Sequence, residues 1–369
     1  MTDFRTKMMR RALALARRGF GKTSPNPAVG CVIVRDGEIA GEGWHRKAGT
    51  PHAEVHALRQ AGEKARGADV YVTLEPCSHH GRTPPCAEAL VNAGVSTVYA
   101  AMMDPNPLVS GRGLALLREA GITVNCGILE QECRLLNEAF IKHVTTGLPF
   151  VILKSAMTLD GKTATASGDS KWITCEESRK YVHGLRAKVD AIMVGVGTVI
   201  ADDPQLTCRM VRGKDPQRIV IDSRLRTPPA ASLFHLESPA KTILATVERD
   251  PQKIAAVQSL GAEPLLCAED EGRVDLEDLL RRLGARGIQS ILLEGGRELV
   301  GSALRKGLVD KFLLFYAPKI IAGEDGFGLC SGRGVERMRD AFTLRNTSVQ
   351  RFAEDFLVIG YPENTCLQD

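Results

Sequence analysis

The sequence of 369 residues has no apolar run that approaches the 18 residues needed for a transmembrane helix. It also has little net charge, +4 at pH 7, which gives no reason to expect a nucleic-acid partner but leaves anionic small substrates open. Residues 1–21 are basic, yet no small-residue cleavage site follows a long apolar core. We therefore interpret this segment as an amphipathic helix and expect no membrane partner.

The ten cysteines are spread along the chain and do not form the dense framework of a disulfide-rich protein. This distribution is typical of reduced thiols, so we expect a cytoplasmic protein. An apolar content of 44% and a charged content of 25% describe an ordinary globular protein, without internal repeats or low-complexity tracts. The length predicts two domains.

The first half alternates regularly between helical and strand patterns. The pattern predicts a helix near the N-terminus and the order αββαβαβαβα, which is typical of an α/β sandwich around a mixed sheet. Asp36-Gly37 predicts a tight hairpin turn between the first two strands. The later elements are expected as strands at 69–77, 95–104 and 122–127 and helices at 52–64, 86–93, 111–120 and 130–143.

Gly and Pro in "TTGLPF" (145–150) interrupt the periodicity, so we place a domain boundary there, between domains 1–146 and 147–369. The second half is predicted to be another α/β domain. Its expected elements are a helix at 176–188 and strands at 150–157, 190–196, 218–222, 241–246, 290–296, 309–318 and 356–361.

The clearest chemical signal is a histidine followed by two separated cysteines. His52 opens a predicted helix, Cys77 ends the next strand, and Cys86 opens the helix after that. One imidazole and two thiolates leave the fourth position of a tetrahedral zinc for water, as in a catalytic site. Glu54, two residues after His52, could reach that water and carry its proton to a departing amine. This order matches the zinc deaminase signature, H-x-E followed by P-C-x-x-C.

The sequence departs from that signature because eight residues, "SHHGRTPP", separate the two cysteines. The longer loop carries His79 and Arg82 and is expected to contribute to a substrate pocket. His56 lies four residues after His52, as in a zinc protease, but Glu54 occupies the wrong position for that chemistry. We therefore interpret His56 as a packing histidine or one that supports the site without binding the metal.

Two Pro-Asn-Pro turns accompany this pattern. Asn26 in "SPNP" precedes the first strand, and Asn106 in "DPNP" follows a later strand. A rigid turn can present the asparagine amide to the edge of a heterocycle. A plain turn without binding function is the alternative.

Two glycine turns mark the second half. "VGVGTV" and "LLEGGREL" each join a strand to a helix, which suits phosphate or pyrophosphate binding but also describes any tight strand-to-helix connection. The first is not a Rossmann fingerprint, because position 200 is Ile. Lys154, Asp202, Arg186 and Arg209 supply charged groups near these segments, and the two arginines could bind a phosphate.

Together these motifs resemble the bifunctional riboflavin-biosynthesis deaminase–reductase family. The resemblance covers essentially the whole chain. In the first half it rests on "PNPAVGCVIV", "GEGWHRKAGTPHAEVHAL", "YVTLEPCSHHGRTPPC" and "DPNPLVSGRG". In the second half it rests on "TLDGKTATASGDSKWIT", "GVGTVIADDPQLTCR", "IDS" and "LEGG".

The resemblance implies a cytidine-deaminase-like domain with one Zn²⁺ and a dihydrofolate-reductase-like domain that uses NADPH. The implied substrate is a phosphorylated pyrimidine, which is first deaminated and then reduced from ribosyl to ribityl. It also implies a homo-oligomer, a dimer or a tetramer.

The resemblance assigns roles to residues by position. It makes His52, Cys77 and Cys86 the zinc ligands and Glu54 the proton shuttle. The implied deaminase pocket residues are Asn26, His45, His79, Arg82, Asp104 and Asn106. The implied nucleotide-binding residues are Ala156, Trp172, Thr198, Asp202, Ser223 and Gly296. The implied substrate residues of the reductase are Ser170, Arg186, Leu206, Arg209 and Glu294. Lys154, Asp202 and Glu294 are expected nearest the reacting centre.

Two alternatives share these motifs. One is a nucleoside or nucleic-acid deaminase with an appended domain, which the cysteine spacing and the absence of a basic patch disfavour. The other is a deaminase whose second domain only binds NADP or mediates oligomerisation. Lys154, Asp202, Glu294 and the two arginines argue against that reading.

Overall fold

The computed structural model describes residues 3–78, 85–107 and 109–363, so His79 and Arg82 lie outside the described residues. The chain divides into two compact units, and the division falls between Gly147 and Leu148 in the sequence. Each unit has its own sheet and its own buried core. Among the described residues, no helix is long and apolar enough to cross a membrane.

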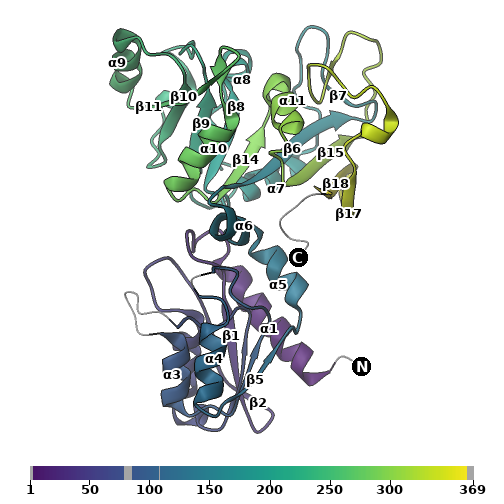
Figure 1. Cartoon of the computed structure of the whole chain (residues 1–369). Coiled ribbons are helices and arrows are strands. Elements are labelled where there is room, and N and C mark those ends of the chain that lie inside the picture. The colour runs from purple at the N-terminus through teal and green to yellow at the C-terminus, as the bar shows by residue number, and fades with distance from the viewer. Residues whose placement is uncertain (1–2, 79–84, 108, 364–369) are drawn as a thin grey trace. The chain divides into compact units, whose positions relative to one another are not determined.

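The first unit is a five-stranded mixed sheet with helices on both faces (Figure 1). The strand order is β2-β1-β3-β4-β5; β1 runs antiparallel to β2 and β3, whereas β3, β4 and β5 are parallel. The strands are β1 (Gly30–Arg35), β2 (Glu38–Trp44), β3 (Asp69–Val72), β4 (Thr97–Ala100) and β5 (Thr123–Cys126). The helices are α1 (Phe4–Gly19), α2 (Ala53–Ala61), α3 (Cys86–Ala93), α4 (Arg112–Glu119), α5 (Glu130–Leu136) and α6 (Glu138–Thr146), with a 3₁₀ turn at Gly62–Ala65.

Glycines in the first two strands allow the helices to pack directly on the backbone of the sheet. A Cβ on Gly30 would lie 2.0 Å from the carbonyl oxygen of Ala12 in α1. A Cβ on Gly43 would lie 2.1 Å from the carbonyl oxygen of Ala53 in α2. Because α1 and α2 meet opposite faces of the β1–β2 hairpin, the start of α2, where His52 lies, is held against the sheet.

The second unit is built on a nine-stranded sheet of order β11-β10-β9-β8-β14-β6-β15-β18-β17. The strands from β11 to β15 are parallel, and β18 and β17 add an antiparallel edge. They are β6 (Phe150–Thr158), β8 (Ala191–Gly195), β9 (Gln217–Ile221), β10 (Thr242–Thr246), β11 (Glu263–Leu266), β14 (Ser290–Glu294), β15 (Lys311–Ala317), β17 (Leu344–Phe352) and β18 (Asp355–Pro362). Short strands form two further pairs: β7 (Lys162–Ala164) with β16 (Phe327–Gly328), and β12 (Glu269–Asp270) with β13 (Arg273–Val274).

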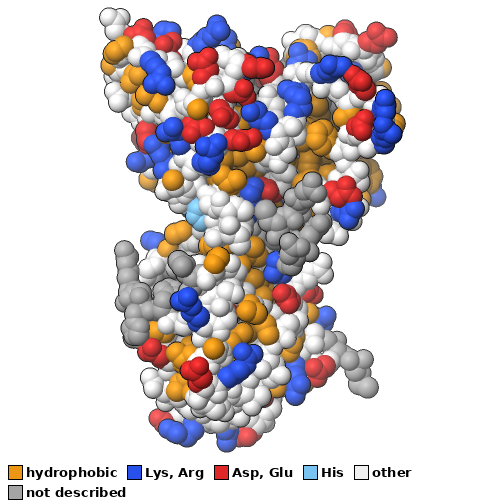
Figure 2. All heavy atoms as spheres, viewed as in Figure 1, with side chains coloured by type: hydrophobic (Ala, Val, Ile, Leu, Met, Phe, Trp, Pro, Cys, Tyr) orange, Lys and Arg blue, Asp and Glu red, His pale blue; other side chains and the backbone are white. Residues whose placement is uncertain are grey.

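Helices cover both faces of this sheet. The apolar faces of α10 (Leu276–Ala285) and α11 (Arg297–Arg305) pack in one core with alternate residues of β14, such as Ile291 and Leu293. On the other face, α8 (Val196–Asp202) and α9 (Pro251–Ser259) contribute to a second core, and α7 (Glu176–Arg186) packs near Phe315. Short 3₁₀ turns lie at Ser232–Phe234 and Met338–Asp340. Side chains of both charge signs intermingle over the visible surface of this unit (Figure 2).

The predicted α/β architecture of both halves is confirmed, with three differences of detail. The helix expected at 130–143 is two helices, because Asn137 leaves helical geometry and bonds the main chain of Ala28 in both directions. The strand expected at 69–77 pairs only as far as Val72. The helices α9 and α10, the strands β11 and β17 and the two short strand pairs were not expected from the sequence.

Candidate functional site

The structure brings His52, Cys77 and Cys86 together in the first unit. Their ligand atoms all lie within 4.8 Å of one another, and His52 Nδ1 is 3.6 Å from Cys77 Sγ and 3.3 Å from Cys86 Sγ. Zinc bonds of about 2.3 Å to sulfur and 2.0–2.1 Å to nitrogen require a nitrogen-to-sulfur separation of about 3.5 Å in a tetrahedron. The two nitrogen-to-sulfur separations therefore match those of a zinc site.

Three different element ends supply these groups. His52 immediately precedes α2, Cys86 is the first residue of α3, and Cys77 follows the end of β3. The Cys86 amide donates to Cys77 Sγ at 3.3 Å, and the Ala87 amide donates to the Cys77 carbonyl oxygen. Hydrogen bonds from Cys86 and, after it, His52 lower the pKa of Cys77 to about 4 against the effect of burial. A thiolate at Cys77 is the form that binds a metal.

Glu54 is buried beside this cluster with only 3% of its surface exposed. Its Oε2 atom is buried and has no hydrogen-bond partner. Burial, and then the negative charge of Cys77, raises the pKa of Glu54 to about 7. A buried carboxyl with one free oxygen and a pKa near neutrality suits proton transfer.

His45 links the Asn26 turn to the start of α2. Its ring is 2% exposed; Nε2 lies 3.1 Å from Asn26 Nδ2, and Nδ1 lies 3.3 Å from the carbonyl oxygen of Pro51. The Nδ2 group of Asn26 can only donate, so Nε2 of His45 accepts and the proton resides on Nδ1, which donates to the Pro51 carbonyl oxygen. The Asn26 oxygen is then oriented away from His45. The ring of His45 also meets that of His52 edge-on, with centroids 5.2 Å apart.

Asp104 and Asn106 form a turn after β4. Asp104 is 9% exposed, and its Oδ1 accepts from the Asn106 amide at 2.9 Å. The Asp104 amide in turn donates to the carboxylate of Glu75, two residues before Cys77. Glu75 has no role that its sequence motif would indicate, because its partners are distant main-chain groups.

His56 lies apart from the three-ligand group. Its Cβ is 2.8 Å from the position that a Cβ would occupy on Gly43 of β2, so its side chain packs against that strand. Its buried Nε2 has no hydrogen-bond partner, and burial followed by Arg46 and Arg59 lowers its pKa.

In the second unit, charged residues gather where β14 ends, beside the middle of β6. Glu294 and Lys154 are register partners on these parallel strands. Arg186 donates from Nε and Nη2 to the two oxygens of Glu294, each at 2.8 Å, and from Nη1 to the Thr207 carbonyl oxygen at 3.0 Å. Burial would raise the pKa of Glu294, but Arg186 and then Lys154 lower it to about 2. Glu294 is therefore an anion throughout the physiological range.

Lys154 and His183 complete this charged group. Burial lowers the pKa of Lys154 although Glu294 opposes the shift. His183, one turn before Arg186 on α7, is 5% exposed, and its Nδ1 has no hydrogen-bond partner. Burial, and then the charges of Arg186 and Arg209, lowers the pKa of His183 to about 4. Sequence reasoning missed His183, although its spacing to Arg186 places it on the same helix face.

The glycine turn after β14 meets the start of α8. Gly295 and Gly296 have φ of 82° and 83°, which other residues rarely adopt, and Gly296 precedes α11. The Thr198 Oγ1 atom lies 3.4 Å and 3.5 Å from the positions that a Cβ would occupy on these two glycines. The two predicted glycine-turn segments are therefore neighbours, and both present main chain at the carboxyl ends of parallel strands.

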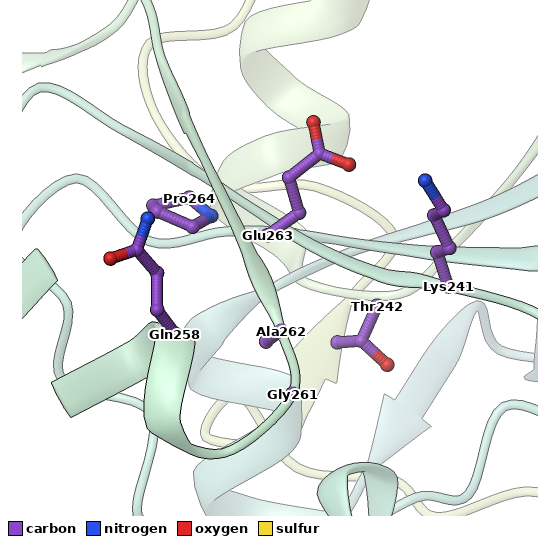
Figure 3. A pocket seen from close by; sticks show the side chains of 7 residues that line it. All are labelled: Lys241, Thr242, Gln258, Gly261, Ala262, Glu263 and Pro264. Atoms are coloured by element: carbon purple, nitrogen blue, oxygen red, sulfur yellow. The ribbon is translucent and has the colours of Figure 1, made fainter. Parts of the chain in front are cut away.

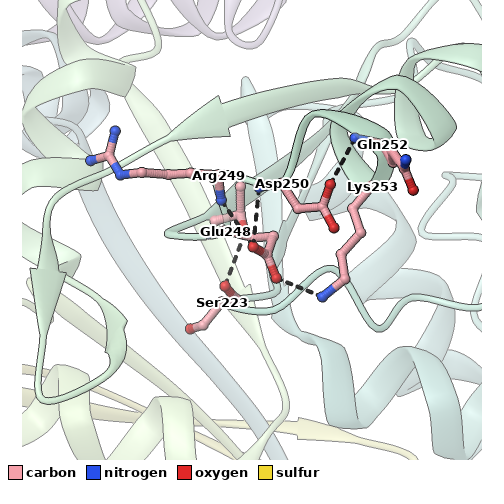
Figure 4. A network of polar contacts seen from close by, with 7 residues as sticks. Ser223, Glu248, Arg249, Asp250, Gln252 and Lys253 are labelled. Carbon is pink, nitrogen blue, oxygen red and sulfur yellow. Dashed lines mark hydrogen bonds and ion pairs between the residues drawn. The ribbon is translucent and has the colours of Figure 1, made fainter.

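Ser223 follows β9 at the same edge of the sheet. Its hydroxyl accepts from the Val274 amide, and its carbonyl oxygen accepts from the Thr246 hydroxyl. Beside it, the Glu248 carboxylate accepts from the Arg249 and Asp250 amides and pairs with Lys253 at 2.6 Å (Figure 4). This network orders the loop between β10 and α9.

The remaining predicted residues differ in accessibility. Asp202 is exposed at the end of α8, and Arg209 is also exposed. Trp172 is 58% exposed, with the Arg179 guanidinium 4.3 Å from its ring centroid. Ser170 is half-buried, and Ala156 lies on β6. Leu206 is 2% exposed and lies within the core beneath α8.

A cavity of about 320 Å³ lies at the opposite ends of the strands of this sheet (Figure 3). Thr242 begins β10 and Glu263 begins β11, so the cavity lies at the amino ends of parallel strands. The glycine turn and the Arg186–Glu294 pair lie at the carboxyl ends, where ligands of open α/β sheets bind. The cavity is lined by Lys241, Thr242, Gln258, Gly261, Ala262, Glu263 and Pro264.

Comparison with known proteins bears on both units. Residues 2–102 match the family model of the cytidine and deoxycytidylate deaminase zinc-binding region, and residues 149–358 match that of the RibD C-terminal domain. The riboflavin biosynthesis protein RibD of Actinobacillus pleuropneumoniae is 48% identical over 97% of this chain and 95% of its own. The RibD protein of Escherichia coli K12 is 47% identical over 94% of this chain and 96% of its own.

Solved structures agree with these matches. Acinetobacter baumannii RibD has a TM-score of 0.88 at 41% identity, covering 98% of this chain and 99% of that one. The diaminohydroxyphosphoribosylaminopyrimidine deaminase/5-amino-6-(5-phosphoribosylamino)uracil reductase of Thermotoga maritima has a TM-score of 0.86 at 39% identity, covering 97% and 99%. The chain therefore belongs to the RibD family of riboflavin biosynthesis proteins, with a cytidine-deaminase-like unit followed by a dihydrofolate-reductase-like unit.

Proposed function

We propose that this chain catalyses two consecutive steps of riboflavin biosynthesis, with residues 1–146 as the deaminase and residues 147–369 as the reductase. The first step is zinc-dependent hydrolytic deamination of 2,5-diamino-6-ribosylamino-4(3H)-pyrimidinone 5′-phosphate. The second is NADPH-dependent reduction of the ribosyl side chain, giving 5-amino-6-(5-phospho-D-ribitylamino)uracil. One observation carries the proposal: His52, Cys77 and Cys86 lie together, and the buried carboxyl of Glu54 beside them has one oxygen without a hydrogen-bond partner.

His52, Cys77 and Cys86 would hold the zinc ion, which supplies the Lewis acid that activates water. Glu54 accepts a proton from the attacking water and delivers it to the departing ring amine. Its buried, unpartnered Oε2 supports this role, because that oxygen has no competing donor within the protein. The pKa of about 7 lets one carboxyl both take up and release the proton near neutral pH.

The deaminase pocket is proposed to be formed by Asn26, His45, Asp104 and Asn106, together with His79 and Arg82 of the loop outside the described residues. The His45 hydrogen bonds fix the Asn26 amide so that its oxygen is available as an acceptor. Such an acceptor suits an N–H edge of the pyrimidine. His45 itself is almost fully buried, so it acts by orienting Asn26 and the start of α2.

In the reductase, NADPH supplies the hydride when it is bound. We propose that Thr198, Ser223 and Gly296, with Ala156, Trp172 and Asp202, hold the nucleotide. The adjacency of Thr198 to the glycine turn supports a phosphate-binding edge, since free main-chain amides at a helix start attract anions. Arg186, Arg209 and Glu294, with Ser170 and Leu206, are assigned to the substrate, and Arg186 and Arg209 to its phosphate. Lys154, Asp202 and Glu294 are the polar groups proposed nearest the reacting carbon.

We also propose that the protein is a cytoplasmic homo-oligomer, a dimer or a tetramer. The nine cysteines in the described part of the chain are all free, which is consistent with a reducing compartment. The nine-residue edge strand β17 is almost wholly exposed, and Val349 on it is 65% exposed. A second copy of the chain would cover this edge strand, whose unpaired main-chain groups could otherwise pair with strands of other proteins. Analytical ultracentrifugation tests this: Val349→Lys should reduce the oligomer mass, and a parent protein that sediments as a monomer contradicts the proposal.

The function as a whole is tested with the purified protein, zinc and the diaminopyrimidine phosphate. Without NADPH, ammonia should be released and the deaminated ribosylamino product should accumulate. Addition of NADPH should then convert that product to the ribityl compound. Release of ammonia from cytidine or an oligonucleotide, with no turnover of the pyrimidine phosphate, would instead indicate a nucleoside or nucleic-acid deaminase.

A further inference from the structure

The carboxylate of Glu75 lies at the junction between the metal-binding strand end and the Asp104–Asn106 turn. Glu75 is 3% exposed, although it is charged and its neighbours in the chain are Leu74 and Pro76. Such a buried carboxylate is stable only if hydrogen bonds replace its lost water. Four main-chain amides provide them.

Each oxygen of Glu75 accepts two of these bonds. Oε2 accepts from the amides of Asp104 and Gly111, both at 3.0 Å. Oε1 accepts from the amides of Gly113 at 2.8 Å and Leu114 at 3.3 Å. The donors lie 29 to 39 residues away in the chain, so one side chain joins the turn after β4 to the first turn of α4.

The first turn of α4 depends on this distant acceptor. Gly111 is the residue before the helix and has no side chain with which to accept from the free amides of that turn. Glu75 takes over this role from the end of β3, and its negative charge suits the amino end of a helix. Gly113 allows the approach, since a Cβ there would lie 1.9 Å from the Pro76 carbonyl oxygen.

The same carboxylate is connected to both halves of the proposed deaminase site. On one side, the chain continues from Glu75 through Pro76 to Cys77. On the other, Glu75 fixes the Asp104 amide, and Asp104 Oδ1 in turn accepts from the Asn106 amide at 2.9 Å. A continuous chain of hydrogen bonds and two peptide units therefore connects a metal-binding thiol to the pocket turn.

We propose that Glu75 is a positioning residue. It sets the location of Asp104 and Asn106 relative to Cys77, the proposed metal ligand in the segment that follows β3. It contacts neither metal nor substrate; it acts through the main chain of its four donors. The proposal rests on the proposed function, because it takes Asp104 and Asn106 as substrate-binding residues. Its consequence is that the affinity for the pyrimidine depends on Glu75 more strongly than the chemical step does.

Glu75→Gln is the direct test. A carboxamide keeps the size of the side chain, but its NH₂ group cannot accept from two of the four amides in either orientation. The KM of the deaminase for the pyrimidine phosphate should rise about tenfold, because a misplaced binding group weakens substrate positioning. We expect kcat to change less than KM, one zinc per chain to remain, and NADPH-dependent reduction of the deaminated intermediate to be unchanged. Glu119→Gln, at the exposed end of the same helix, is the matched control and should leave KM unaltered.

Hydrogen exchange of the unaltered protein provides a second test that does not depend on the folding of a variant. The amides of Asp104, Gly111, Gly113 and Leu114 should exchange slowly, although Asp104 and Gly111 lie outside regular structure. Fast exchange at all four, or an unchanged KM in Glu75→Gln, would overturn the positioning role. Parallel loss of zinc and of reductase activity would also overturn it, since that indicates general unfolding. A parent protein that never releases ammonia from the pyrimidine phosphate would instead refute the proposed function.

Discussion

Arg186 and Glu294 form a two-pronged ion pair, in which the guanidinium donates to both carboxylate oxygens at 2.8 Å. Their side chains are only 13% and 11% exposed. Removing one charge of such a pair leaves the other buried without a partner, which typically costs about 3–5 kcal/mol. Glu294→Gln should therefore lower the free energy of unfolding of the second unit by an amount in that range and impair reduction.

A surface pair in the same unit is the control for this variant. Arg286 and Glu263 are 2.6 Å apart, but their side chains are 38% and 37% exposed. Exposed pairs contribute about 0–1 kcal/mol, so Glu263→Gln should change stability little. Calorimetry measures both variants, with the reductase transition identified by its upward shift on addition of NADPH. Equally small decreases in unfolding free energy in the two variants would show that the Arg186–Glu294 pair stabilises the protein no more than an exposed pair does.

Glu54→Gln should keep zinc and lose deamination. The amide cannot take a proton from water, so we expect the deamination rate to fall by about 10²- to 10⁴-fold. Metal analysis and ammonia release measure the two effects, and reductase activity reports on folding. If zinc were lost in proportion to activity, Glu54 would have to be a ligand.

The two histidines at the start of α2 should respond oppositely to replacement. His52→Ala removes one of three proposed ligands, so zinc should be lost. His56→Ala should keep one zinc per chain, because His56 packs against Gly43. The variant should lower the free energy of unfolding by about 0.5–3 kcal/mol, as an ordinary packing change does. Metal content of the purified variants decides the matter, and a zinc-free His56→Ala protein would refute the assignment of His56 as a packing residue.

His183 predicts a pH-dependent stability of the second unit. Its pKa is about 4 in the folded protein, against an ordinary value of 6.5, because it is buried and faces Arg186 and Arg209, with Glu294 opposing. Between these values the unfolded chain binds a proton that the folded chain does not, so stability falls as the pH drops from 6.5 to 4. His183→Gln should flatten this dependence in the reductase transition. An identical pH profile in the variant and the parent would contradict the expectation.

Local chemistry accounts for the parts of the fold that the sequence predicts well. Asp36-Gly37 forms the expected hairpin turn, with both residues at positive φ, and α3 runs from Cys86 to Ala93 before a left-handed Gly94. Long-range contacts account for the errors. The break at Asn137 depends on Ala28, 109 residues earlier, and no pattern in 130–143 reveals it.

Two kinds of missed element have different causes. The strand β17 is exposed along almost its whole length, so it lacks the apolar alternation that identifies a half-buried strand. By contrast, α10 carries a clear helical signal that could have found it. Asp275 caps its first turn, and Leu276, Leu279, Leu280 and Leu283 follow at helical spacing and are buried.

The candidate site divides in the same way. Residue type and order suffice to group His52 with Cys77 and Cys86, because imidazole and thiolate suit a zinc site and the helix and strand ends bring the three side chains together. They do not reveal Glu75, whose partners are main-chain amides that any residue could supply. They also do not reveal His183, whose pKa is lowered by burial and then by arginines from α7 and a following loop.

The central claim is that one chain carries a metal-dependent deaminase and a reductase that work independently. The most direct test is to remove zinc with a chelator and to supply NADPH with either the diamino substrate or its deaminated product. The metal-free protein should consume NADPH only with the deaminated product, and restored zinc should return NADPH consumption with the diamino substrate. Unchanged turnover of the diamino substrate without metal, or no NADPH consumption with either compound in the zinc-loaded protein, would contradict the account.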